Sequence, residues 1–209
     1  MFRKMSLRIF ILLILSLALV SCNEDNKLEE EISNINVDFI VERFDKAYAD
    51  AKPADLPKLK EAYPFLFSKH VPDSVWIERI NDTLQNQLLI EVGKAYGDFK
   101  DVDFDFERLF QHLKYYDKTF SVPRIVTLTN DVDYRNKTIV TDSLLLVALD
   151  NFLGEDHEFY QNIPRYLAQN MRRGQIIPEV AEAYAKKYAF QSNRKTLLDE
   201  MIYHGKLLY

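Results

Sequence analysis

Apolar side chains recur at a helical period along much of this chain. The strongest pattern begins within VPDSVW and reaches Gly97, with an apolar residue at every fourth position, as on one face of an α-helix. Its members are Trp76, Ile80, Leu84, Leu88, Val92 and Tyr96. The pattern predicts one long core helix that is capped by Asp73 or Ser74 and ends at Gly97.

Shorter periodic segments predict further helices. Apolar residues from Val37 to Tyr48 favour a helix over 37–50, and Pro53 and Pro57 bracket a short second helix. The other predicted helices cover 103–116, a segment that starts near Pro178, and a last segment in which Leu197, Leu198 and Met201 are expected to face inward.

The period changes to that of β-strands in two places. VPRIVTLT is rich in β-branched residues and predicts a strand over 124–129, and KTIVTDSLLLVALD predicts a second strand over 138–149. We expect these two strands to pair antiparallel. The pattern as a whole predicts an α+β fold, a mainly helical single domain with a small antiparallel β element.

The N-terminal segment is typical of a secretory signal. Arg3, Lys4 and Arg8 are followed by Ile9 to Val20, which is apolar except for Ser16. A membrane-spanning helix needs about 20 apolar residues, so this run is too short to cross a bilayer. Its length and its positive flank are those of a signal peptide.

The signal ends in a lipobox, the sequence Leu19-Val20-Ser21-Cys22. The small Ser21 suits a signal peptidase, and the Cys22 thiol can take a diacylglyceryl group before cleavage makes it the new N-terminus. Residues 1–21 are then the lipoprotein signal peptide, and Cys22 is the lipidation site, with fatty acyl chains such as palmitate. Two or three acyl chains give stable anchoring. The alternative is a free cysteine in a cleaved signal or in a single-pass anchor.

The segment after Cys22 is polar and acidic. We interpret residues 22–36 as a tether and residues 37–209 as the folded domain. A sorting signal for the outer surface is a second interpretation of the acids near the cysteine. The chain ends on the apolar HGKLLY, which we interpret as the truncated C-terminus of a longer domain.

Charge and cysteine content exclude some classes of partner. Loss of residues 1–21, with three basic and no acidic residues, would change the formal net charge from −5 to −8. A chain with this negative net charge is not expected to bind nucleic acid or to bind anionic lipid through basic residues. Cys22 is the only cysteine, so the domain has no disulfide to form.

Few residues suggest catalysis or metal binding. His157-Glu158 resembles the start of a zinc-protease motif, but position 161 is Gln instead of the second His. Asp131 and Asp133 alternate like ligands of a hard cation, although a turn explains them better. The other histidines are His70, His112 and His204. We therefore predict no catalytic residue, no metal site and no cofactor.

Several segments together resemble the gliding motility-associated lipoprotein GldB family of Bacteroidota. They are VERFDKAYAD, YPFLFSKHVPDSVWIERINDTLQ, VPRIVTLTNDVDYRN and FLGEDHEFYQNIPRYLAQNMRRGQIIPEVAEAYAKKY. The resemblance implies an envelope lipoprotein that is needed for gliding motility and for the associated secretion machinery. The family is distantly similar to zincin-like peptidases, so a degenerate zincin-like arrangement is a further expectation for the fold. Cys22 is the one functional residue that the resemblance carries over.

These observations favour a non-enzymatic lipoprotein of the cell envelope. It would be lipid-anchored, would face the periplasm or the cell surface, and would act through contacts with other gliding and secretion proteins. A divergent or inactive zincin-like peptidase and a ligand-binding envelope module are the two alternatives.

Overall fold

A computed structural model describes residues 23–208, so the signal peptide and Cys22 lie outside the described residues. The chain forms two compact units. The smaller unit takes the segment that ends at Val37 together with Phe110–Phe120. The larger unit takes Asp38–Leu109 and the chain from Ser121 onward.

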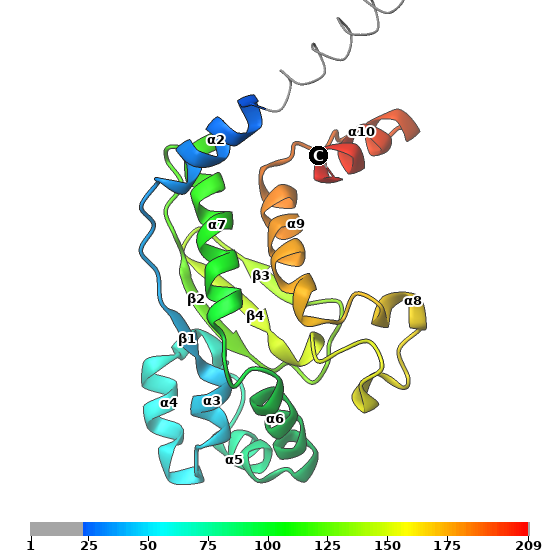
Figure 1. The fold of residues 1–209 in the computed structure, drawn as a ribbon. Coiled ribbons are helices and arrows are strands. Elements are labelled where there is room, and N and C mark those ends of the chain that lie inside the picture. The colour runs from blue at the N-terminus through cyan, green and yellow to red at the C-terminus, as the bar shows by residue number, and fades with distance from the viewer. Residues whose placement is uncertain (1–22, 209) are drawn as a thin grey trace, which may run out of the picture. The chain divides into compact units, whose positions relative to one another are not determined.

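Helices dominate the chain, and a small sheet accompanies them, which confirms the predicted α+β class (Figure 1). The helices are α2 (Asn23–Ser33), α3 (Phe44–Ala49), α4 (Leu56–Ala62), α5 (Asp73–Asn81), α6 (Thr83–Ala95), α7 (Lys100–Tyr116), α8 (Arg165–Ala168), α9 (Ile176–Tyr188) and α10 (Leu197–Leu208). The strands are β1 (Val41–Arg43), β2 (Arg124–Leu128), β3 (Thr138–Val140) and β4 (Leu144–Ala148). The 3-10 turns are η1 (Pro53–Asp55), η2 (Pro64–Leu66), η3 (Leu149–Asn151), η4 (Glu158–Tyr160) and η5 (Arg173–Gln175). No helix within residues 23–208 is both long enough and apolar enough to cross a bilayer.

The four strands form one sheet in the order β1-β2-β4-β3. β1, β2 and β4 run parallel, with Ile125 of β2 between Val41 and Leu145, and only β3 runs antiparallel, beside β4. The predicted antiparallel pairing of 124–129 with 138–149 is therefore wrong. The second predicted strand is two strands, because a tight turn from Thr141 to Leu144 reverses the chain, with Leu144 N donating to Thr141 Oγ1 over 2.9 Å.

The helix predicted over 37–50 is largely wrong. Only Phe44–Ala49 is helical, and the preceding Val41–Arg43 is strand β1. The edge of β2 offers a full ladder of backbone hydrogen bonds to these three residues. Tertiary pairing of this kind overrides the local apolar period, which does not distinguish a short buried strand from a helix.

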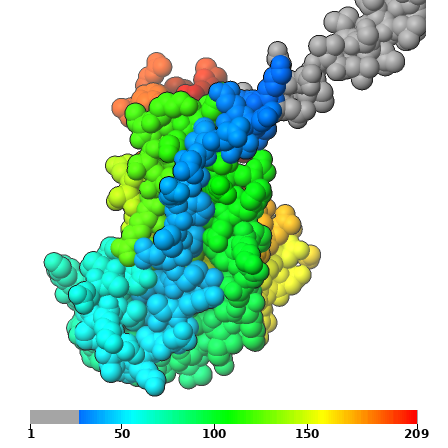
Figure 2. All heavy atoms as spheres, turned by 60° about the vertical axis from the view of Figure 1, so that its left-hand side comes forward, coloured from blue at the N-terminus to red at the C-terminus, as the bar shows by residue number. Residues whose placement is uncertain are grey.

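One face of the sheet packs against helices α3 to α6. The buried residues of this cluster are Phe44, Tyr48, Leu56, Leu59, Phe67, Ile80, Leu89 and Val126. In Figure 2 the cyan part of the chain, which includes α4, lies together on the surface. The alternate residues Ile125, Leu145 and Val147 point to the other face and are also fully buried. Because both faces are covered, the strands read as continuous apolar runs, as in other parallel sheets.

The long helix predicted from VPDSVW to Gly97 is two helices, α5 and α6. Asp82 between them is extended, and its carboxylate accepts a hydrogen bond from Gln85 N over 2.7 Å, as an N-cap does. Because α6 begins anew after Asp82, the apolar residues at every fourth position no longer lie on one buried helix face. Ile80 and Leu88 remain in the core, but Leu84 is 61 % exposed.

Helix α10 presents its apolar side chains outward. Leu197, Leu198 and Met201, predicted to face inward, are all exposed, whereas Asp199 and Glu200 are half-buried. The periodicity correctly predicted an amphipathic helix but not the direction of its apolar face.

The smaller unit contains the segment predicted as a tether. Residues 23–33 form helix α2, whose Ile32 is buried. Gln111 Nε2 donates to the carbonyl oxygens of Ser33 and Ile35, each over 3.2 Å, and Lys114 Nζ donates to Asn36 O over 3.2 Å. The acidic segment is thus helical within its unit, and its role as a spacer stays a prediction.

Candidate functional site

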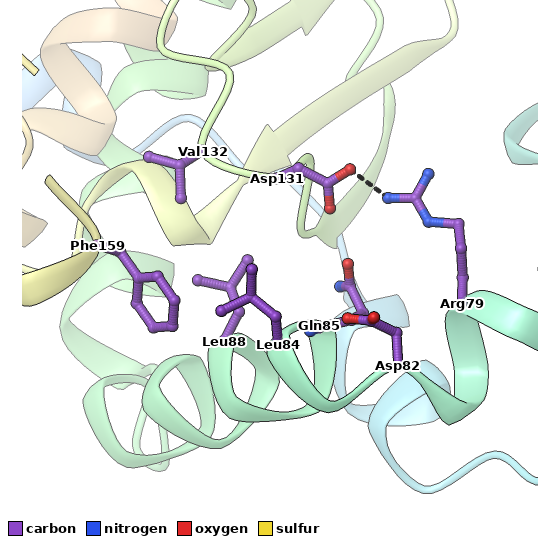
Figure 3. Close-up of a pocket in the computed structure, with 8 residues that line it drawn as sticks. All are labelled: Arg79, Asp82, Leu84, Gln85, Leu88, Asp131, Val132 and Phe159. Carbon is purple, nitrogen blue, oxygen red and sulfur yellow. Dashed lines mark hydrogen bonds and ion pairs between the residues drawn. The ribbon is translucent and has the colours of Figure 1, made fainter. Parts of the chain in front are cut away.

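The carboxyl ends of β2 and β4 lie side by side, and in sheets with parallel strands ligands commonly bind in the crevice at this edge. A cavity of about 410 Å³, which we call the strand-end pocket, opens here (Figure 3). It is lined by Arg79, Asp82, Leu84, Gln85, Leu88, Asp131, Val132 and Phe159. Its volume falls in the range of roughly 300–1,000 Å³ that small-molecule sites occupy.

The strand-end pocket has an apolar side and a charged side. Leu84 and Leu88 of α6 lie opposite Phe159 and Val132 and form the apolar side (Figure 3). On the charged side, Arg79 Nη2 donates to a carboxylate oxygen of Asp131. Leu84 is exposed here because α6 begins anew after its N-cap Asp82, and Leu84, in the first turn of this helix, faces away from the core.

The loop after β2 holds two consecutive residues in the left-handed region of backbone space. Asp131 has φ 60° and Val132 has φ 57°. Aspartate tolerates this conformation, but for a β-branched valine it is a true outlier. Strain of this size persists only where the surroundings impose it, and such sites cluster in functional loops.

Asp150, in the turn η3 that directly follows β4, holds this conformation. Its side chain is fully buried, and its carboxylate accepts hydrogen bonds from Asn130 N over 3.1 Å and from Val132 N over 2.7 Å. Burial raises the pKa of Asp150 to about 6, although the two backbone N–H groups oppose the rise because they favour the charged form. A buried carboxylate thus organises the wall of the strand-end pocket.

A second cavity of about 290 Å³, which we call the aromatic pocket, lies on the other side of the Arg79–Asp131 ion pair. It shares Arg79, Gln85 and Asp131 with the strand-end pocket. Its remaining lining is Phe44, Tyr48, Leu66, Phe67, Trp76, Leu128, Thr129 and Asn130.

Two polar atoms of the aromatic pocket are buried without a hydrogen-bond partner among the described residues. They are the Tyr48 hydroxyl and Trp76 Nε1. Buried polar groups in folded proteins are almost always hydrogen-bonded, and an unpaired one costs about 1–3 kcal/mol. Each of these two atoms has less than 1 Å² of accessible surface, so it is enclosed by protein atoms and is not open to the cavity.

The two aspartates that the sequence suggested as cation ligands, Asp131 and Asp133, have different hydrogen-bond partners. Asp131 pairs with Arg79, whereas Asp133 accepts hydrogen bonds from Asn136 Nδ2 and Arg135 N. They belong to the loop between β2 and β3, as the turn interpretation predicted. Among residues 27–208, whose side chains the structure describes, no group of three or more His, Cys, Asp or Glu side chains could hold a metal ion.

The histidines are likewise dispersed. His157 precedes η4, where its Nδ1 accepts a hydrogen bond from Phe159 N over 3.3 Å and its Nε2 lies 3.6 Å from a carboxylate oxygen of Glu91. His112 lies 3.2 Å from Glu29 in the smaller unit, and His204 lies on α10. Cys22, the predicted lipidation site, lies outside the described residues.

Sequence reasoning missed the residues that organise both pockets. Trp76 and Tyr48 were identified as core positions, and Asp150 directly follows the strand predicted over 138–149. The one available signal was the acid of LLLVALDN, which directly follows a buried run. An acid at the end of a buried strand lies at the edge where sites form.

The chain was compared with known families, curated proteins and solved structures. A family model described as gliding motility protein GldB matches residues 25–209. Neither a curated protein nor a solved structure matched the chain.

Proposed function

Because this chain belongs to the gliding motility protein GldB family, we propose that it is a cell-envelope component of gliding, held by lipid on Cys22 and acting through contacts with other envelope proteins. The observation that carries the proposal is the family match over residues 25–209. The match begins three residues after Cys22, as expected for a mature lipoprotein whose signal peptide ends at Ser21.

Lipid anchoring gives this role a physical basis. Two or three acyl chains, at about 0.8 kcal/mol per buried CH₂, keep a protein on a bilayer without a spanning helix. Confinement to one surface raises the effective concentration of the protein for other anchored partners. The acidic residues of α2 and the negative total charge favour lipid insertion over electrostatic attraction as the source of membrane affinity.

The strand-end pocket is the surface that we assign to a protein contact. Leu84, Val132 and Phe159 offer an apolar opening, and the Arg79–Asp131 pair beside it can fix the orientation of a polar group. An apolar anchor side chain in a small pocket is the usual centre of a protein interface. The pocket suits an aliphatic or aromatic side chain of an envelope partner.

Replacement of Cys22 by alanine is expected to abolish lipid attachment and colony spreading. The variant gene is expressed in cells that lack their own copy, and the measurements are incorporation of an alkyne fatty acid, membrane fractionation and spreading. Asn23→Ala is the matched control, because it leaves the acceptor thiol in place. Normal spreading of Cys22→Ala cells with the protein released from the membrane would refute the anchoring role.

Replacement of Leu84 by aspartate is expected to leave the fold intact but to reduce spreading strongly. Leu84 is exposed in the first turn of α6, where an acid suits the helix dipole, so the unfolding free energy should change by only about 0.5 kcal/mol. The matched control is Val75→Asp, an exposed aliphatic residue in the first turn of α5 that lines neither pocket. Equal spreading of both variants would exclude the strand-end pocket as the contact surface.

A further inference from the structure

Helix α10, which contacts α9, points its apolar face away from the protein (Figure 1). We call this the outer face, and its side chains, between 50 % and 90 % exposed, are Leu197, Leu198, Met201, Ile202 and Leu208. The half-buried side of the helix consists of Asp199, Glu200, Tyr203 and Leu207. A surface helix normally turns its apolar stripe toward its own core, so the reversed arrangement marks a face that a partner covers.

The size of the outer face fits a contact between two helices. An exposed apolar patch of more than a few hundred Å² is rare on a protein that acts as a monomer. Pairing of two such faces would bury on the order of 1,000 Å² in total, which is near the lower limit for a specific protein interface. One helix of a second molecule is therefore enough to cover the outer face.

The charges of α10 favour an antiparallel copy of the same helix as this partner. Asp199 and Glu200 lie in the first turn, and Lys206 lies in the last turn. Asp199 and Lys206 are seven positions apart and so lie on the same side of the helix. In an antiparallel pair the acids of one copy lie beside Lys206 of the other, whereas a parallel pair places like charges together. The helix dipoles have the same preference, because each N-terminus then meets a C-terminus.

Gly205 adds a fit in shape to the fit in charge. It lies on the outer face between Met201 and Leu208, and a Cβ built there meets no atom within 4 Å. Packing within this chain therefore does not require glycine, which costs about 1 kcal/mol relative to alanine inside a helix. In an antiparallel pair Met201 of one copy lies beside Gly205 of the other, where the missing side chain leaves room for it.

From these observations we infer that the outer face of α10 binds the same face of a second copy of this chain, as an antiparallel helix pair. A two-fold axis that passes between Ile202 and Tyr203 brings Asp199 of each copy beside Lys206 of the other. A contact of this kind is closed after two copies, so it gives a dimer. The inference concerns a different surface from the strand-end pocket and does not depend on lipid anchoring.

Replacement of Met201 by aspartate is expected to separate the dimer into monomers, because it puts two charges into the centre of the apolar contact. Sedimentation equilibrium of the full chain in non-ionic detergent should show a dissociation constant that is about 10-fold higher or more. Lys206→Glu should raise it about 3- to 10-fold, because two attractive charge pairs become repulsive. Ile40→Asp is the matched control, since Ile40 is 80 % exposed and lies outside α10. Met201 is itself 64 % exposed, so circular dichroism should show an intact fold in the Met201→Asp variant.

Introduced cysteines determine the direction of the pair. Cys22→Ala is the background, so that each introduced cysteine is the only one in its chain. In the antiparallel pair the two copies of position 202 are offset by one residue, or about 1.5 Å along the helix, and the two copies of position 197 by eleven residues, or about 16.5 Å. A disulfide joins Cα atoms that are less than about 7 Å apart. Mild oxidation should therefore link Ile202→Cys chains to each other but not Leu197→Cys chains.

Positions 197 and 208 provide the decisive comparison, because the same two-fold axis places them opposite each other. A mixture of Leu197→Cys and Leu208→Cys chains with different tags should form the mixed disulfide, whereas neither variant alone should form a dimer. This pattern supports the inference. Efficient linkage of Leu197→Cys to itself, a dissociation constant that Met201→Asp does not change, or a chain that stays monomeric overturns it. A monomer that binds phospholipid vesicles through α10, and loses this binding in Met201→Asp, also overturns it and identifies a bilayer as the occupant.

Discussion

Asp45→Ala is expected to lower the free energy of unfolding by about 3–5 kcal/mol, because it leaves the charge of Arg43 in the protein interior without its partner. The Asp45 side chain is 2 % exposed and that of Arg43 is 14 % exposed. Arg43 donates to both carboxylate oxygens of Asp45, and the Thr127 hydroxyl donates to one of them. Arg43 also donates to Tyr96 O over 2.9 Å, so this ion pair joins β1, β2 and the end of α6.

Urea unfolding followed by circular dichroism measures the effect. The double variant Arg43→Met/Asp45→Leu should cost much less than Asp45→Ala, since it removes both charges and fills their space with apolar groups. Glu182→Ala is the control for an exposed pair, because Glu182 and Lys186 are both about half exposed, and it should change stability by only about 0.5 kcal/mol. If Asp45→Ala lowers the free energy of unfolding by less than about 1 kcal/mol, the Arg43 guanidinium is hydrated without its partner and the expectation is wrong.

Elements that are set by local sequence were predictable. The amphipathic segment 103–116 lies within α7, and Pro178 falls in the first turn of α9, where its missing N–H costs nothing. The short helix between Pro53 and Tyr63 is also present, as η1 and α4. The apolar period alone predicts the first of these helices, and proline placement marks the other two, so no distant contact is needed to decide the structure.

Elements that depend on distant partners were not predictable. Val41–Arg43 becomes a strand because β2, some eighty positions later in the chain, presents a free edge to it. The break at Asp82 has a local signal, an N-cap aspartate, but six apolar residues in register outweighed it in the interpretation. Helix α10 shows the same limit, since periodicity reveals an apolar face without showing what covers it.

The pockets could not be found from the sequence for a related reason. Tyr48, Trp76 and Asp150 come from three segments that meet only in the folded sheet. Each has an ordinary structural role in its own segment, as a core aromatic or as an acid after a strand. What distinguishes them is their hydrogen-bonding state, which depends on neighbours far away in the chain.

Asp150→Ala is expected to destabilise the protein by about 2–4 kcal/mol and to release the strained loop at the strand-end pocket. The substitution removes the acceptor of Asn130 N and Val132 N, and each buried donor left unpaired costs about 1–3 kcal/mol. Nothing would then hold Asp131 and Val132 at positive φ. Hydrogen exchange at the Asn130 and Val132 amides should speed up together with the loss of stability.

The control for this loss is Asp133→Ala, an exposed acid of the same loop whose hydrogen bonds are also exposed. It should change the unfolding free energy by about 0.5 kcal/mol and leave exchange at Val132 unchanged. Unaltered exchange at Asn130 and Val132 in Asp150→Ala would show that the loop holds its conformation without the buried carboxylate.

The titration of Asp150 also predicts how the stability of the protein changes with pH, and in which direction. The pKa of Asp150 is raised to about 6 in the folded protein, against about 3.9 in an unfolded chain. The folded state therefore binds the Asp150 proton more tightly than the unfolded state does. This proton binding stabilises the fold fully at pH values below the unfolded-state pKa, and the stabilisation is lost as the pH rises through about 6. Relative to Asp150→Asn, which cannot titrate, the wild-type protein should gain stability as the pH falls from 7 to 4. Urea unfolding across this range and the ¹³C carboxyl shift of Asp150 test this expectation. A midpoint near 4 would contradict it, because it would mean that the backbone donors cancel the effect of burial on the pKa.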